Sequence, residues 1–240
     1  MKKFIFDIDG TLTPSRKQID PSFEAFMIKF CCKHDVYLVT GSNREKTIDQ
    51  IGLDVYYRAH RVYNCAGNDV YEKDKNVYRN PWKLPDDAKE FLLKELKQSL
   101  FSVRTGTHIE DRPGCVNFSI LGRGANWTER EVYKEWDRDN HERIEIAKRF
   151  NKAFPELYAF VGGETGVDIS LKGCDKGQIL KDFDPKDEIH FFGDRMDEDG
   201  NDYPLAEALK EMDGSTHYVT GWEDTRTRLV EFSTSGEFFK

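Results

Sequence analysis

Two acidic residues near the N-terminus are spaced so that one pocket could hold both side chains. Asp7 and Asp9 follow the apolar stretch Phe4–Phe6, where a short strand would end in a loop. Side chains alternate along an extended chain, so residues i and i+2 project to the same side, about 7 Å apart. Two carboxylates at that distance repel each other unless a cation lies between them or one keeps its proton. The pair predicts a site for a divalent cation such as Mg2+, or else a turn with two surface acids.

The residues near this pair fit the binding of a phosphoryl group. Gly10 and Thr11 suit a loop whose backbone comes close to phosphate oxygens and donates to them. Thr40 or Ser42, after a second apolar stretch, could hydrogen-bond a phosphoryl oxygen. With a cation to neutralise the acids, Asp7 would be free to attack phosphorus.

Two more acids and a lysine extend this pattern in the second half of the chain. Asp194 follows the apolar residues 189–192 and a glycine, and Asp202 lies at the next predicted helix start. Lys176 opens a predicted helix, where it could pair with both the phosphoryl group and Asp7. A lysine at a helix start is usually solvated, so this residue alone indicates little. Together, acids at two strand ends and this lysine favour a site for phosphoryl transfer.

The elements that position these residues alternate between strand and helix. Asp20-Pro21 predicts a helix start, and apolar residues at helical spacing follow it as far as Phe30. Residues 35–39 predict the next strand, and Thr40-Gly41-Ser42 leads from it into a second helix that ends near Gly52. Such alternation predicts a parallel sheet, in which ligands bind at the carboxyl ends of the strands.

The middle of the chain has a different texture from the two ends. A strand at 61–65 and a small hairpin over 70–78 precede it, and the parallel pattern resumes with a helix at 175–183, a strand at 188–192 and a helix at 201–210. Between them we expect a mixed insert with a helix at 84–100, a helical stretch at 128–153 that is interrupted near residues 137–140, and short strands at 101–104, 116–120, 157–161 and 167–171. The sequence therefore predicts a core domain of residues 1–80 and 176–240, interrupted by an inserted domain of residues 81–175.

These motifs resemble those of a known superfamily. The haloacid dehalogenase superfamily of phosphotransferases has similar elements to Asp7-Ile8-Asp9-Gly10-Thr11, Thr40-Gly41-Ser42, Lys176, and Gly193-Asp194 with Gly200-Asn201-Asp202. Within it, the eukaryotic-type phosphomannomutases are similar along nearly the whole chain, at Asp9 to Arg16, Asn117 with Gly122-Arg123, Gly162-Gly163 with Asp168, and Glu223-Asp224-Thr225-Arg226. The resemblance implies an α/β fold, with a Rossmann-like parallel core and an inserted α/β cap that contains an antiparallel sheet and closes over the substrate.

The resemblance also implies roles for the acidic residues. Asp7 would be the nucleophile that forms an aspartyl phosphate, and Asp9 would be the acid and base for the sugar oxygens. Mg2+ would be held by Asp7, the backbone carbonyl of Asp9, and Asp194. Asp202 would hold Lys176, which is catalytic, or a metal-bound water.

The substrate-binding residues implied by the resemblance lie in both domains. In the core they are Arg16, Thr40, Gly41 and Ser42; in the cap they are Asn117, Asp168 for sugar hydroxyls, and Arg112 and Arg123 for a phosphate remote from Asp7. Two positions depart from the family pattern. Thr105 stands where an arginine is usual, and Gly166 stands where a serine is usual.

We therefore expect an enzyme that interconverts mannose 6-phosphate and mannose 1-phosphate, primed by a hexose 1,6-bisphosphate. The alternative, which Thr105 and Gly166 favour, is a sugar-phosphate phosphatase of the same superfamily, in which water attacks the aspartyl phosphate. A third class is a catalytically silent protein that keeps the fold for recognition, and the intact acids argue against it.

Composition limits the partners and the compartment. The chain has 240 residues and a formal net charge of -8, which disfavours nonspecific binding to nucleic acid. No apolar run approaches the roughly 20 residues of a membrane span, and the N-terminus lacks a signal-peptide pattern. The five cysteines form no CxxC pair, which is typical of a reducing compartment. We expect a cytoplasmic protein that binds a small sugar phosphate, and the resemblance implies a homodimer formed through the cap.

Overall fold

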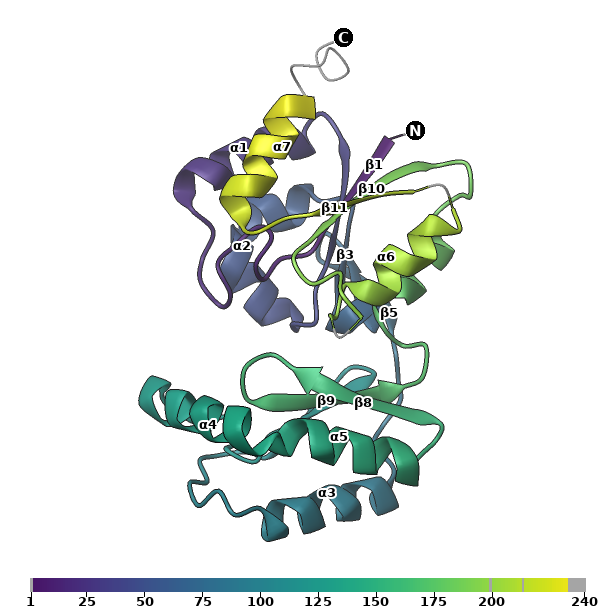
Figure 1. The fold of residues 1–240 in the computed structure, drawn as a ribbon. Coiled ribbons are helices and arrows are strands. Elements are labelled where there is room, and N and C mark those ends of the chain that lie inside the picture. The colour runs from purple at the N-terminus through teal and green to yellow at the C-terminus, as the bar shows by residue number, and fades with distance from the viewer. Residues whose placement is uncertain (1, 199, 213, 233–240) are drawn as a thin grey trace. The chain divides into compact units, whose positions relative to one another are not determined.

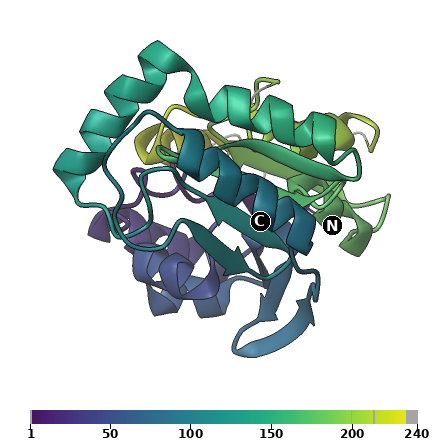
Figure 2. The same ribbon diagram turned by 90° about the horizontal axis from the view of Figure 1, so that it is seen from below.

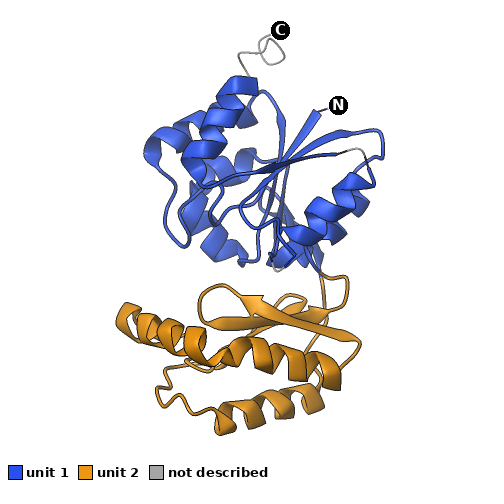
Figure 3. Cartoon of the chain, in the orientation of Figure 1, with its two compact units in different colours: residues 1–79, 175–240 blue, residues 80–174 orange. Residues whose placement is uncertain are grey.

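The structure is a computed structural model, and it describes residues 2–198, 200–212 and 214–232. The chain divides into two compact units. The first lies within residues 1–79 and 175–240, and the second comprises residues 80–174 (Figure 3). The chain thus leaves the first unit once, builds the second, and returns.

The first unit is built on a sheet in which five strands run parallel. Its strand order is β11-β10-β1-β2-β3-β4-β5. The parallel strands are β1 (Lys2–Phe6), β2 (Asp35–Val39), β3 (Arg61–Asn64), β10 (Glu188–Gly193) and β11 (Ser215–Tyr218). The hairpin of β4 (Asp69–Glu72) and β5 (Lys75–Arg79) is antiparallel. The predicted parallel core is confirmed.

Helices cover both faces of this sheet because its central strands are apolar on both sides. Phe4 and Phe6 pack with α1 (Pro21–Cys31), α2 (Arg44–Arg58) and α7 (Trp222–Phe232), whereas Ile5 packs with η2 (Lys176–Asp182) and α6 (Tyr203–Lys210) (Figure 1). A short 3-10 helix, η1 (Cys65–Gly67), follows β3.

Local signals set the boundaries of the first helices. Asp20 caps α1, as predicted, because its Oδ1 accepts from the backbone N of Ser22 at 2.8 Å and of Phe23 at 3.2 Å. The predicted end of the second helix near Gly52 is wrong, since α2 continues to Arg58. Gly52 has φ 77°, so the chain kinks there and then resumes helical geometry, which glycine tolerates at little steric cost.

The second unit is a four-stranded antiparallel sheet with helices on one face (Figures 1 and 2). Its order is β6-β7-β9-β8, formed by β6 (Ile109–Arg112), β7 (Cys115–Phe118), β9 (Gly166–Leu171) and β8 (Leu157–Gly162). The helices are α3 (Asp86–Gln98), α4 (Trp127–Asn140) and α5 (Glu142–Ala153). Phe118 and Ile169 pack with Phe150 of α5 in the core of this unit. The predicted antiparallel sheet is confirmed.

One predicted strand of this unit is wrong. Residues 101–104 are irregular, and the first strand is β6, which starts at Ile109. Phe101 is buried by ring contacts instead, with its centroid 4.9 Å from Tyr133 and 5.8 Å from Trp136. An apolar run of this length does not reveal whether it is buried by strand pairing or by packing on a helix.

In the described part of the chain, every helix is too short or too polar to cross a lipid bilayer.

A half-buried histidine in β11 gives the fold a pH dependence. The ring of His217 stacks on Phe192 at 4.4 Å, and its Nε2 lies 3.1 Å from Nδ1 of His190. Burial, and then the nearby His190 and Arg228, lower the pKa of His217 from 6.5 to about 4. Between these values the folded state binds fewer protons than the unfolded state, so its stability falls as the pH falls.

We expect His217 to contribute a loss of about 1 kcal/mol in the free energy of unfolding between about pH 7 and about pH 5, after allowance for its partial exposure. Urea unfolding of wild type and His217→Phe at both pH values measures this contribution. The variant should show the smaller drop, and an equal drop in both proteins would contradict the prediction.

Candidate active site

The carboxyl ends of two neighbouring strands bring Asp7 and Asp194 together. Strands β1 and β10 pair in parallel with Phe6 opposite Phe192, and the backbone N of Asp7 donates to the carbonyl of Phe192 at 2.9 Å. Asp7 and Asp194 each follow the last residue of their strand. The sheet therefore delivers both acids to one edge, as expected for parallel strands.

A buried lysine lies between two of the acids. Lys176, at the start of η2, donates through Nζ to Asp7 Oδ1 at 2.5 Å and to Asp202 Oδ1 at 2.7 Å. All three residues are at most 2% exposed. Asp202 Oδ2 accepts from the backbone N of Arg195 at 3.1 Å, so both of its oxygens are engaged. Asp202 thus holds Lys176 against Asp7.

The charges in this cluster perturb one another. Burial raises the pKa of Asp7 well above its ordinary value, and the nearby Asp202 and Asp194 add to the shift against the opposing effect of Lys176. Burial, and then Asp202, raise the pKa of Asp194 to about 6. Burial opposes the charge of Lys176, but Asp202 and Asp7 outweigh it and raise the pKa of the ammonium. One lysine does not neutralise three acids.

The cluster fits a hard divalent cation. Asp7, Asp194 and Asp202 each offer a carboxylate oxygen, and these oxygens lie within 4.8 Å of one another. Oδ1 of Asp194 is buried and has no hydrogen-bond partner among the described residues. A Cβ at Gly10 would lie 2.3 Å from Asp194 Oδ2, so the glycine leaves the room that this carboxylate occupies. Oxygen donors with excess negative charge are the set that Mg2+ takes.

Asp9 is not part of this carboxylate group, which corrects the expectation that the side chains of Asp7 and Asp9 share one ion. The chain turns directly after Asp7, because the backbone N of Leu12 and of Thr13 both donate to the carbonyl of Ile8 at 3.0 Å. The alternation of an extended strand therefore stops before Asp9. The other ligand that the resemblance implies from this residue is its backbone carbonyl.

The carboxylate of Asp9 instead faces α2. Its Oδ1 accepts from the backbone N of Arg16 at 2.7 Å and from Gln50 Nε2 at 3.0 Å. Its Oδ2 lies 3.7 Å from Lys46 Nζ. Sequence reasoning missed Gln50 and Lys46, because they lie within a helix and belong to none of the motifs that were considered.

The loop after β2 lies beside Lys46. Thr40 Oγ1 accepts from the backbone N of Ser42 at 3.1 Å, and Ser42 Oγ accepts from Lys46 Nζ at 2.9 Å. A Cβ at Gly41 would meet no atom within 4 Å, so the loop leaves open space there. Lys46 thus links the Ser42 hydroxyl to the Asp9 carboxylate.

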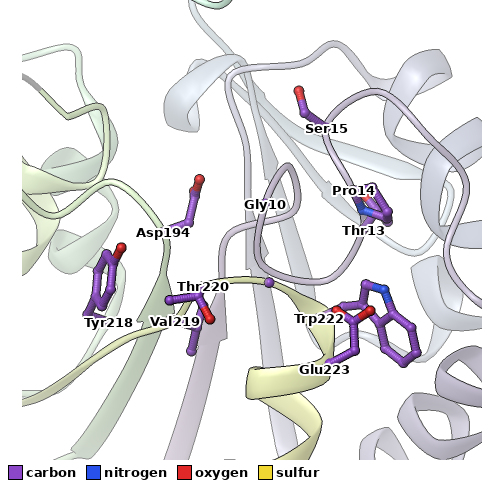
Figure 4. A pocket seen from close by; sticks show the side chains of 11 residues that line it. Gly10, Thr13, Pro14, Ser15, Asp194, Tyr218, Val219, Thr220, Trp222 and Glu223 are labelled. Atoms are coloured by element: carbon purple, nitrogen blue, oxygen red, sulfur yellow. The ribbon is translucent and has the colours of Figure 1, made fainter.

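A cavity of about 500 Å3 adjoins Asp194 within the first unit (Figure 4). The loop after β1 lines it through Gly10 and residues 13–15, and the segment that joins β11 to α7 lines it through residues 218–223. Figure 4 shows Asp194 across the cavity from Trp222 and Glu223. Of the three clustered acids, Asp194 therefore borders this cavity.

The four residues predicted in the cap gather on the polar face of the second sheet. Arg112 Nη2 and Arg123 Nε both contact one oxygen, Oε2 of Glu110, at 2.7 and 2.8 Å. Asn117 Nδ2 donates to Asp168 Oδ1 at 2.5 Å, and Arg112 Nη1 lies 3.8 Å from that oxygen. Glu110, Asn117 and Asp168 are opposite one another on β6, β7 and β9.

Glu110 is a member of this group that sequence reasoning missed. Its position two residues before Arg112 on a strand, and so on the same face, was the available signal. Burial acts to raise the pKa of Glu110, but Arg112 and Arg123 outweigh it and lower the pKa. Burial acts against the charge of Arg112, and Asp168 and Glu110 nevertheless raise its pKa. The two guanidiniums are therefore held together by a shared carboxylate.

Two glycines are fitted closely to this polar group. A Cβ at Gly162 would lie 1.9 Å from Asp168 Oδ2, and a Cβ at Gly166 would lie 2.5 Å from Asn117 Nδ2. A serine at position 166, which the family pattern predicts, would therefore displace the Asn117 amide. The glycine and the position of Asn117 are two parts of one local arrangement.

The fold and the site define a class of protein. A solved structure with a similar fold is a haloacid dehalogenase-like hydrolase from Bacteroides thetaiotaomicron, with a TM-score of 0.62 and 13% identity over 96% of this chain and 98% of that chain. The fold is therefore that of the haloacid dehalogenase class, with acids at the ends of β1 and β10 and an inserted antiparallel sheet.

Within this class the family is also clear. The model of the family described as eukaryotic phosphomannomutase matches residues 23–234. A phosphomannomutase of Spinacia oleracea is 31% identical over 95% of this chain and 94% of its own, and one of Saccharomyces cerevisiae is 30% identical over 95% and 92%. The chain belongs to the eukaryotic phosphomannomutase family and is an enzyme of it. The resemblance inferred from the motifs is confirmed.

Proposed function

We propose that this enzyme interconverts mannose 6-phosphate and mannose 1-phosphate by Mg2+-dependent phosphoryl transfer through Asp7, primed by a hexose 1,6-bisphosphate. The observation that carries the proposal is the buried contact of Lys176 Nζ with Asp7 Oδ1 at 2.5 Å, beside Asp194 and Asp202. A buried carboxylate next to a fixed cation is suited to nucleophilic attack, because the cation favours its ionised form. Membership of the phosphomannomutase family supports this choice of substrate.

The transfer proceeds in two balanced steps. A carboxylate oxygen of Asp7 forms a bond to phosphorus as the bond from phosphorus to the sugar oxygen breaks, and Asp9 gives that oxygen a proton. In the second step the free 6-hydroxyl of mannose 1-phosphate attacks the aspartyl phosphate, Asp9 takes its proton, and Asp7 is released as mannose 1,6-bisphosphate forms. Repetition of the first step at the 1-phosphate of that bisphosphate returns a phosphoryl group to Asp7 and leaves mannose 6-phosphate. The covalent intermediate divides one difficult displacement into two easier ones.

The remaining core residues hold charge in place. Asp7, Asp194 and the carbonyl of Asp9 would hold Mg2+, which when bound would neutralise charge on the phosphoryl oxygens. Asp202 keeps Lys176 in position, since its two oxygens are occupied by Lys176 and by the backbone N of Arg195. The Thr40 and Ser42 hydroxyls and Arg16 would bind phosphate oxygens from the core.

The polar face of the second sheet would bind the phosphate that is not reacting. Arg112 and Arg123 already converge on one anionic oxygen, that of Glu110, which shows that both guanidiniums reach a common anion. Guanidiniums bind phosphate through paired donors. Asn117 and Asp168, joined at 2.5 Å, would bind sugar hydroxyls.

Conversion of mannose 1-phosphate by the purified protein, with Mg2+ and glucose 1,6-bisphosphate, tests the proposal. We expect 31P NMR to show the signal of mannose 6-phosphate replacing that of the substrate. Release of inorganic phosphate without isomerised sugar would instead support the phosphatase alternative, which Thr105 and Gly166 favour. If neither mannose 6-phosphate nor inorganic phosphate forms, both functions are contradicted.

A further inference from the structure

Gln50 is a buried polar side chain in α2 that contacts the loop after β1. It is 2% exposed, and its Nε2 donates to Asp9 Oδ1 at 3.0 Å and to Thr13 Oγ1 at 3.3 Å. Its Oε1 is buried and accepts no hydrogen bond from the described residues. Burying an amide oxygen without a hydrogen-bond partner costs free energy, so the fold keeps Gln50 in contact with Asp9 despite an unfavourable contribution to stability. The mechanism above gives Gln50 no role.

The two oxygens of Asp9 have different surroundings. Oδ1 receives two N–H donors, from the backbone of Arg16 at 2.7 Å and from Gln50 at 3.0 Å. Both groups can only donate, so Oδ1 is held as an acceptor. Oδ2 accepts no hydrogen bond from the described residues, and it lies 3.7 Å from Lys46 Nζ. The Asp9 side chain is 30% exposed. Oδ2 is therefore the oxygen that remains available to a substrate.

The contacts of Gln50 also span the turn that carries Asp9. Asp9 and Thr13 form an isolated β-bridge, and the backbone N of Gly10 donates to the carbonyl of Thr13 at 2.8 Å. The Gln50 side chain donates to a side chain at each end of this turn. The backbone carbonyl of Gln50 accepts from the backbone N of Ile19 at 2.7 Å. One residue of α2 thus fixes both the turn and the carboxylate on it.

We propose that Gln50 is a positioning residue that fixes the Asp9 carboxylate so that Oδ2 is the atom that gives and takes the proton of the sugar oxygen. The inference rests on the proposed function, in which Asp9 is the acid and base. In the first step the proton leaves Oδ2 for the departing sugar oxygen. In the second step Oδ2 takes the proton of the attacking hydroxyl, and Oδ1 stays bound to Gln50 and Arg16 throughout.

Gln50→Met tests this role, because methionine has a similar length and no donor. We expect kcat of the mutase reaction to fall about 10- to 100-fold, because a misplaced acid and base loses part of its contribution to the rate. We expect KM for glucose 1,6-bisphosphate to change by less than about threefold. Gln178→Met is the matched control, since Gln178 Nε2 donates to the carbonyl of Ala66 at 2.8 Å and not to Asp9. The control should keep kcat within about threefold of wild type.

A double-mutant cycle separates positioning from general loss of structure. If Gln50 acts through Asp9, Gln50→Met should cause little further loss of kcat in an Asp9→Asn background. A full multiplicative loss in that background, or a wild-type kcat in Gln50→Met alone, would overturn the inference. If the wild type makes no mannose 6-phosphate, the proposed mutase function fails first, and the same cycle is measured by release of inorganic phosphate from mannose 1-phosphate.

Discussion

Replacing Asp7 with asparagine is expected to lower mutase turnover by about 10⁴-fold or more, because an amide cannot serve as the attacking group. Asp7 is 2% exposed, and its Oδ1 accepts a hydrogen bond from Lys176 Nζ. The conversion of mannose 1-phosphate, followed by 31P NMR, measures the loss. Circular dichroism should show that the variant is folded, since asparagine has the same shape and can still accept from Lys176.

Asp20→Asn is a useful control for this variant. Asp20 caps α1 through Oδ1, a contact that an asparagine oxygen also makes, and it lies outside the acidic cluster. Its turnover should match that of wild type. Turnover of Asp7→Asn within tenfold of wild type would show that the nucleophile is a different group.

Replacing Lys176 with methionine is expected to damage both stability and activity. Lys176 is 1% exposed between Asp7 and Asp202, and removing it leaves two buried carboxylates without their shared cation. Removing one partner of a buried ion pair lowers the free energy of unfolding by about 3–5 kcal/mol. Urea unfolding should show a loss of that size, and turnover should fall at least about 100-fold.

Two further variants separate the causes of this loss. Lys210→Met removes an exposed lysine that pairs with Glu207, so it should leave the stability close to that of wild type. Adding Asp202→Asn to Lys176→Met removes one of the stranded charges, and it should restore part of the stability but not the turnover. Equal stability of Lys176→Met and wild type would contradict the view that this lysine stabilises the buried carboxylates of Asp7 and Asp202.

The parts of the fold that depend on local signals could be predicted from the sequence. The Asp20 cap and the alternation of strand and helix predicted α1, β2 and the parallel sheet, since each signal lies within the element that it defines. The strand at 101–104 was wrong, because an apolar segment is buried equally well by Tyr133 and Trp136 of α4. The outcome there depended on residues about 30 positions away in the chain.

The site shows the same division. The sheet register brings Asp7 and Asp194 to one edge, and strand ends are readable from sequence. The direction in which Asp9 points is set by a turn and by Gln50, which is 41 residues away, and no local pattern carries that information. Glu110 contacts two arginines, and strand alternation would predict this contact if the bounds of β6 were known. The sequence instead predicted a strand at 101–104.

The central claim is that Asp7 carries the phosphoryl group during turnover. The most direct test is to mix the enzyme with Mg2+ and glucose 1,6-bisphosphate, stop the reaction in acid, and locate the phosphorylated residue by mass spectrometry of peptides. The account predicts phosphate on the peptide that contains Asp7 and none on the same peptide of Asp7→Asn. A stable phosphate on any other residue, or turnover with an unmodified Asp7 at every time of quenching, would contradict it.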